Sequence, residues 1–253
     1  MMRAACGGQV GSRAVIRGAA VVMAALALVG CESSQEQSAR LERVAKLAAA
    51  HETRVNKGLT IARESTDVKV LSANVVTSSE GAVAVVTVRN DSSWTLASVP
   101  IAIDVRNARG QTLFQNEVAG LEPALTAISL VPAHGEAMWV DDQLPRSGQP
   151  ASVAVRIGEV PAVSGPTPRI EVQGLHPEEA GAGAAGTVRN RSHVAQRRLV
   201  VFVVARRAGR LVAAGRAVLA ELSPGASAPF QVFFVGSAAG ASLRASAPAT
   251  TLG

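Results

Sequence analysis

The sequence predicts an all-β protein in which two tandem β-sandwiches follow a short helical tether. Short runs rich in Val, Ile and Thr are separated by Gly, Pro, Asn and Ser, the strand and turn pattern of sandwiches. The hexapeptide at residues 87–92 (TVRNDS) recurs at residues 187–192 (TVRNRS). Beyond residue 58 no amphipathic pattern is long enough for a helix. These observations predict one all-β unit present in two copies.

Residues 1–30 have the features of an export signal. Their only charged residues are Arg3, Arg13 and Arg17, and residues 19–29 form an apolar run. Such a run would span ~16 Å as a helix, too short for a hydrocarbon core of ~30 Å. The run ends in Leu-Val-Gly-Cys, with the cysteine at position 31. This ending resembles the lipobox of bacterial lipoprotein signal peptides.

The lipobox resemblance implies that residues 1–30 are removed and that Cys31 receives fatty acyl chains such as palmitate. Two or more chains would hold the protein firmly at a membrane. The expected location is therefore the cell membrane or the outer membrane, lipid-anchored and outside the cytoplasm. An ordinary secretory signal with an incidental Cys31 is the alternative. Cys6 and Cys31 are the only cysteines, so the mature chain is expected to have no disulfide.

Residues 31–66 are predicted to be a polar tether with a helical middle. Leu41, Val44, Ala48 and Val55 share one stripe of an amphipathic helix. Two interpretations remain open for this stripe. It could form a short dimeric coiled coil, or a stalk helix that stands alone or packs on the first sandwich.

The two predicted sandwiches comprise residues 67–160 and 168–253. In each, the repeated hexapeptide precedes a long apolar strand, at residues 99–105 and 199–204, and then a basic turn with glycine. A further strand and a Leu-x-Pro turn follow in both copies. Residues 82–88 (AVAVVTV) are interpreted as a strand with a period of two.

This order of Val-x-Asn, long strand, glycine turn and Leu-x-Pro resembles the FxLYD-type immunoglobulin-like modules of bacterial lipoproteins. The resemblance implies an immunoglobulin-like sandwich for each copy and brings no active site with it. The Phe and Tyr for which FxLYD is named are missing, and the chain has no tyrosine at all.

Charge distinguishes the two copies. Residues 67–160 contain six basic and ten acidic side chains, whereas residues 168–253 contain ten arginines and four glutamates. Residues 161–167 are expected to be a stiff Pro-rich linker, and residues 248–253 are expected to fray.

Seven arginines of the second copy lie within 22 residues and are expected at opposite strand ends, as a band along one edge of the sandwich that is a candidate surface for an anionic partner. They are Arg189, Arg191, Arg197, Arg198, Arg206, Arg207 and Arg210. The functional interpretation is contact with phospholipid headgroups or an acidic envelope protein. The alternative is that these charges keep the sandwich soluble and protect an edge strand from pairing. Nucleic acid is excluded as a partner because no aromatic platform accompanies the arginines.

No catalytic, metal or cofactor site is predicted. The four histidines are far apart in sequence. Asp141 and Asp142 are adjacent on a predicted strand and should point to opposite faces. The glycine-rich residues 181–186 lack the Lys-Ser/Thr of a phosphate loop and are interpreted as a hairpin turn.

Asn90 and Asn190 match glycosylation sequons but are expected to end strands. Trp94 and Trp139 are the only tryptophans. Both are expected to be buried, while an exposed Trp94 would be a candidate contact with a partner.

The predicted function is a non-enzymatic, lipid-anchored envelope protein that acts as an interaction or scaffolding module. The alternative is a ligand-binding accessory subunit of an envelope transport system, with its ligand between the domains. A cleft between the domains lined by Trp94 or Trp139 would favour that alternative.

Overall fold

The structure is a computed structural model that describes residues 58–252, which belong to one compact unit. The predicted signal segment and the predicted tether helix lie outside the described residues. The all-β prediction is confirmed: all strand pairing is antiparallel. The described residues contain only two short 3-10 turns besides strands, η1 (Pro123–Leu125) and η2 (Glu179–Gly181).

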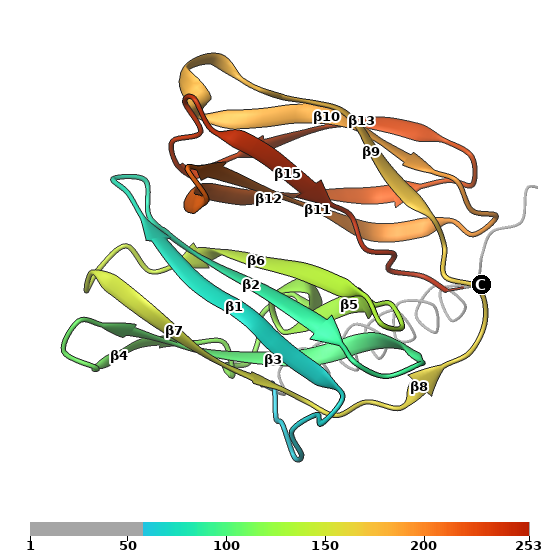
Figure 1. Cartoon of the computed structure of the whole chain (residues 1–253), viewed down its shortest axis with the longest axis horizontal. Helices are drawn as coiled ribbons and strands as arrows, with labels where there is room; N and C mark the ends of the chain where they lie inside the picture. Colours follow the sequence, from blue (N-terminus) through green and yellow to red (C-terminus); the bar gives the residue numbers. More distant parts are fainter. Residues whose placement is uncertain (1–57, 253) are drawn as a thin grey trace, which may run out of the picture. The chain divides into compact units, whose positions relative to one another are not determined.

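The first half consists of two sheets (Figure 1). One has the order β1-β2-β6, and in the other β3 pairs with β4, β5, β7 and β8. The strands are β1 (Val68–Thr77), β2 (Ala82–Asn90), β3 (Thr95–Asn107), β4 (Thr112–Gln115), β5 (Ala127–Val131), β6 (Glu136–Leu144), β7 (Pro150–Ile157) and β8 (Ala162–Val163).

The second half repeats this arrangement. Its sheets have the orders β13-β10-β9 and β14-β12-β11-β15. In each half the second strand, β2 or β10, lies in the middle of a three-stranded sheet. The third strand, β3 or β11, pairs with the strand that follows it, β4 or β12, and with the later strand β7 or β15. The strands are β9 (Ile170–Pro177), β10 (Gly183–Asn190), β11 (Gln196–Arg207), β12 (Arg210–Leu222), β13 (Ser227–Phe233), β14 (Val235–Gly236) and β15 (Ser242–Ser246).

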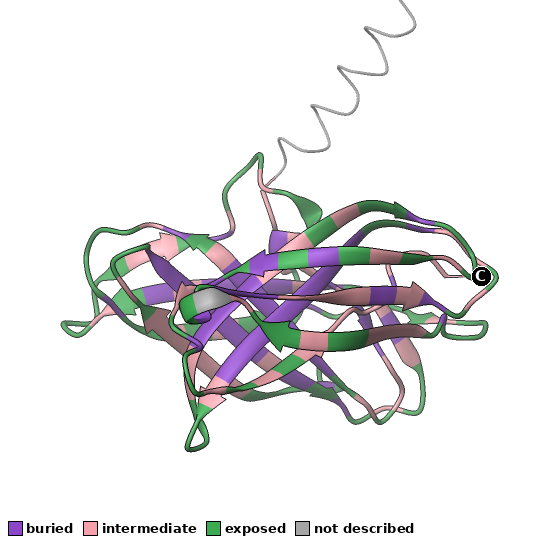
Figure 2. Ribbon diagram, turned by 90° about the horizontal axis from the view of Figure 1, so that it is seen from above, coloured by how far each residue is buried: buried purple, intermediate pink, exposed green. Residues whose placement is uncertain are grey.

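The two halves pack on each other through apolar sheet faces. On β11, Leu199, Val201 and Val203 belong to the core of the second half. The alternate residues Val200 and Phe202 belong to the core cluster of the first half. This strand is buried on both faces, which explains its nearly uninterrupted apolar sequence. Figure 2 shows buried residues running through the strands and exposed residues at the turns.

Strand β2 confirms the strand predicted at residues 82–88. Six of these seven residues are buried, so this part of the strand has no solvent-facing side. The period of two in the sequence is an alternation of smaller and larger apolar residues. Both faces of β2 are covered, so this strand also has no polar face.

The predicted linker and the C-terminal segment are both held in place. Linker residues Ala162 and Val163 form β8 and pair with β3. The expectation that residues 248–253 fray is wrong for the described part, because the buried Gln196 side chain needs hydrogen-bond partners. Its Oε1 accepts from the backbone N–H groups of Thr250 at 2.8 Å and Thr251 at 3.1 Å, and Ala249 is buried.

Candidate functional site

The repeated hexapeptide forms the same asparagine-centred turn in both halves. Asn90 ends β2 and is fully buried. Its Nδ2 donates to the carbonyl oxygens of Trp94 at 2.6 Å and Pro132 at 3.1 Å, and its Oδ1 accepts from the Ser92 backbone N–H at 3.0 Å. The expectation that this asparagine ends a strand is confirmed, and its amide is occupied by protein partners.

Asn190 ends β10 with matching bonds. Its Nδ2 donates to the carbonyl oxygens of Val194 at 2.8 Å, Leu222 at 3.1 Å and Ser223 at 3.2 Å. Each buried amide thus joins the end of its own strand to a distant turn. Because both asparagines are fully buried, neither side chain is accessible for glycosylation in the folded chain.

The asparagine turn of the first half presents a large exposed aromatic side chain. Trp94 is 62% exposed, whereas Trp139 is fully buried and donates its Nε1–H to the carbonyl oxygen of Ala124 at 2.8 Å. The burial expected for both tryptophans is therefore confirmed for Trp139 and wrong for Trp94. At the matching place in the second half stands Val194, which is half-buried.

The seven candidate arginines fall into two groups at opposite ends of β11. The first group lies near the start of β11 and at the end of β10 with the turn that follows it; its members are Arg189, Arg191, Arg197 and Arg198. The other is at its end and in the turn to β12, and comprises Arg206, Arg207 and Arg210. Nine to ten residues of strand separate the groups by ~30 Å. The structure therefore does not bring the seven side chains into one site.

Acidic side chains neutralise part of the first group. Arg191 Nε lies 2.8 Å from a carboxylate oxygen of Glu171, and this contact lowers the pKa of that carboxyl. Arg198 lies 3.3 Å from Glu122. Arg189 is half-buried, and its Nε has no hydrogen-bond partner among the described residues. Arg191 and Arg198 are thus ion-paired, whereas Arg189 and Arg197 have no ion pair among the described residues.

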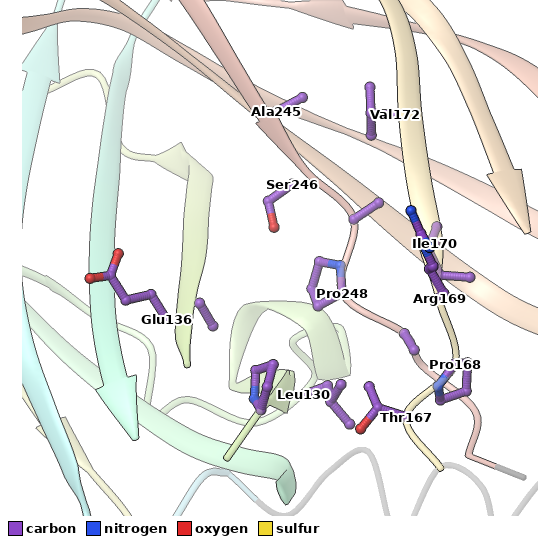
Figure 3. A pocket seen from close by; sticks show the side chains of 14 residues that line it. Leu130, Glu136, Thr167, Pro168, Arg169, Ile170, Val172, Ala245, Ser246 and Pro248 are labelled. Atoms are coloured by element: carbon purple, nitrogen blue, oxygen red, sulfur yellow. The ribbon is translucent and has the colours of Figure 1, made fainter. Parts of the chain in front are cut away.

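An open cleft of about 380 Å³ lies between the two halves (Figure 3). Leu130, Glu136 and Ala137 line it from the first half, and Arg169, Ile170 and Pro248 are among its residues in the second half. Glu136 and Arg169 are its only charged residues, and neither tryptophan lines it. The cleft has a suitable volume for a small molecule but lacks the converging polar groups that would orient one.

Asp141 and Asp142 point to opposite faces of β6, as expected. Asp142 Oδ1 accepts from Arg216 Nε of β12 at 2.9 Å, so this pair joins the two halves. Asp141 is fully buried; its Oδ1 accepts from the backbone N–H of Gln143, and its Oδ2 has no partner among the described residues. Burial raises the pKa of Asp141 to about 6. One acid is thus ion-paired, and the other is buried with one oxygen that has no partner among the described residues.

Replacing Asp141 with Asn should stabilise the protein at pH ~7.5 by roughly 1–2 kcal/mol. Because the folded state raises the pKa of Asp141 from 3.8 to about 6, the protonated form favours folding. This contribution is complete below pH ~4 and is lost as the pH rises through ~6, so the variant should also show a flatter pH dependence across this window. Urea unfolding at several pH values measures both effects.

Asp142→Asn is the matched control for this prediction. It removes a charge from the neighbouring position but breaks the contact with Arg216, and should therefore lower the free energy of unfolding. Equal shifts of the same sign in the two variants would contradict the environment assigned to Asp141.

No group of three or more His, Cys, Asp and Glu side chains that could hold a metal ion occurs in the described part. Within residues 58–252 no helix has the length and apolar character needed to cross a membrane. The lipidation candidate Cys31 precedes the described residues.

Comparison with known proteins leaves the family open. No protein-family model and no curated protein matches the chain. Over 82% of its length it is similar to a solved structure, red sea bream transglutaminase, at 14% sequence identity and a TM-score of 0.21. The chain spans 30% of that structure's length. At this TM-score the similarity carries no argument about fold or function.

Proposed function

We propose that this chain is a non-enzymatic, lipid-anchored protein of the cell envelope that acts as an interaction module. Cys31 would carry the acyl chains, and the described residues would form the body outside the cytoplasm. The apolar segment at residues 19–29 and the Leu-Val-Gly-Cys ending support the anchor.

Each half is proposed to be an immunoglobulin-like sandwich. The second strand pairs with β6 in the first half and with β13 in the second, and the third strand pairs with β7 and β15 respectively. Pairing of this kind, between strands that are not consecutive in the chain, is typical of Greek-key sandwiches. Such sandwiches commonly bind through the turns at their ends.

The exposure of Trp94 is the observation that carries the interaction role. Its backbone carbonyl accepts from Asn90 and from Ser92 Oγ at 3.2 Å, and its N–H donates to Ser92 Oγ at 3.3 Å. The turn is therefore ordered before any partner binds, and little conformational entropy would be lost on binding. An exposed aromatic on a preorganised turn is typical of a binding hot spot.

Cross-linking in cells, followed by affinity capture, tests this proposal. The wild type should remain in the membrane fraction and capture a discrete envelope partner. Trp94→Ala should reduce the captured amount at least ~10-fold, because hot-spot aromatics contribute ~2 kcal/mol or more. Val194→Ala, at the matching turn of the second half, should leave capture unchanged.

Cys31→Ser is the control for location in the same experiment, and it should release the protein from the membrane fraction. Retention of Cys31→Ser would contradict the anchor. Equal capture by Trp94→Ala and the wild type would contradict the role of the exposed tryptophan.

The accessory-subunit alternative receives less support. A cleft lies between the halves, but it lacks both tryptophans and contains only two charged residues. The interaction module remains the function that the described geometry supports best.

A further inference from the structure

The hairpin between β11 and β12 concentrates positive charge at a narrow tip. Its two turn residues, Ala208 and Gly209, both have positive φ angles, 48° and 78°, as a tight two-residue hairpin requires. Arg207 and Arg210 are direct cross-strand partners on either side of this turn, and Arg206 precedes them. Like charges at such positions destabilise a hairpin.

No carboxylate relieves this repulsion within the described part of the chain. Arg206 Nη1 donates to the carbonyl oxygen of Gly209 at 3.0 Å, and Arg207 Nη2 donates to the carbonyl oxygen of Ala239. None of the described ion pairs involves Arg206, Arg207 or Arg210. Each guanidinium has five N–H donors, so most donors of the three side chains remain available to a ligand.

The matching hairpin of the first half carries less net positive charge, because Arg106 is paired with Asp104 and only Arg109 of its turn has no ion pair among the described residues. There, Arg106 Nε donates to Asp104 Oδ2 at 2.9 Å, and this bond lowers the pKa of Asp104. One hundred residues later, Val204 stands at the position of Asp104 and Arg207 at that of Asn107. The second half has therefore lost the acid and gained an arginine at the same structural place.

We propose that the arginine hairpin, defined as Arg206, Arg207 and Arg210, contacts the phosphate groups of anionic phospholipids. Guanidinium groups pair well with phosphate because they donate two parallel N–H bonds. Residues 207–210 are all exposed, so a flat charged surface can approach the turn. The residues between the arginines are Ala208 and Gly209, so the tip lacks the buried aromatic anchor on which a protein interface centres.

This inference rests on the proposed membrane location and deepens it. The chain between Cys31 and Gly58 could extend to at most ~90 Å, whereas the thirteen-residue strand β12 spans ~43 Å. Fully extended, the chain before Gly58 would be about twice as long as this strand, so its length alone does not keep the arginine hairpin from the same membrane. The body of the protein would then contact that membrane at a second point.

Vesicle co-sedimentation tests the inference without an acyl anchor. The chain from residue 31 onward, with Cys31→Ser, contains every strand and both apolar cores of the described structure. It should bind vesicles of equal parts phosphatidylglycerol and phosphatidylcholine, but not pure phosphatidylcholine. Each arginine near an anionic surface contributes about fivefold to the partition constant, so Arg206→Gln/Arg207→Gln/Arg210→Gln should lower it roughly 100-fold.

Arg169→Gln/Arg191→Gln/Arg198→Gln is the matched control, since it removes three exposed, ion-paired arginines of the same half. It should change the partition constant less than about fivefold, and circular dichroism should show both variants folded. Equal losses in the two variants would overturn the inference, as would absence of wild-type binding to the anionic vesicles. Tighter binding to soluble polyglutamate than to vesicles would indicate an acidic protein partner and overturn it too. Because the acyl chain is absent, these outcomes do not depend on whether Cys31 anchors the protein.

Discussion

Asn190→Ala should lower the free energy of unfolding by ~3 kcal/mol, and Asn90→Ala by a similar amount. Each substitution removes the donor shared by carbonyl oxygens of two turns, together with the acceptor for a Ser backbone N–H at 3.0 Å. Both asparagines are fully buried, so water cannot replace these bonds without opening the strand end. Urea unfolding of the single variants, followed by circular dichroism, measures the loss.

Asn107→Ala is the control for this effect. The Asn107 side chain accepts turn bonds from the N–H groups of Arg109 at 2.9 Å and Gln111 at 3.0 Å, both on the exposed surface. Solvent can satisfy these groups, so the expected loss is ~1 kcal/mol or less. If Asn90→Ala or Asn190→Ala cost no more than Asn107→Ala, the buried amides would not be the stabilising centres of the two turns.

The second large effect is expected at the contact between the halves. Arg216→Leu should lower the free energy of unfolding by ~3 kcal/mol, because it leaves Asp142 without its ionic partner. The Arg216 side chain is only 5% exposed, and its guanidinium also lies 3.5 Å from Glu122. Urea unfolding of the wild type should show one transition, since the two halves share an apolar contact.

A double variant separates the charge from the packing. Replacing a buried ion pair with apolar residues is often neutral, so Arg216→Leu/Asp142→Leu should recover most of the stability lost in Arg216→Leu. Equal instability of the single and double variants would mean that the loss comes from packing and not from an unpaired carboxylate.

The sequence by itself was sufficient to predict the all-β fold. Val- and Thr-rich runs cannot form a helix with an apolar stripe where they alternate with turn residues, and the repeated hexapeptide marks the same strand end twice. It also placed Asn90 and Asn190 at strand ends, and an Asn side chain can accept from the backbone N–H two residues later, which closes a local turn. The two-residue turn at Ala208 and Gly209 also depends on local sequence, because glycine readily adopts the positive φ that such a turn requires.

Only the tertiary structure decided which surfaces are exposed and which charges are paired. The apolar run of β11 predicted a strand, but not that one of its faces packs against the other half. Arg216 and Asp142 are 74 residues apart, and no local pattern connects them. Trp94 and Trp139 look equally apolar in the sequence, yet one is exposed and the other buried. Burial and ion pairing depend on contacts between segments that are distant in the sequence. The sequence therefore could not show that Arg191 and Arg198 are ion-paired with Glu171 and Glu122 whereas the arginines of the arginine hairpin are not.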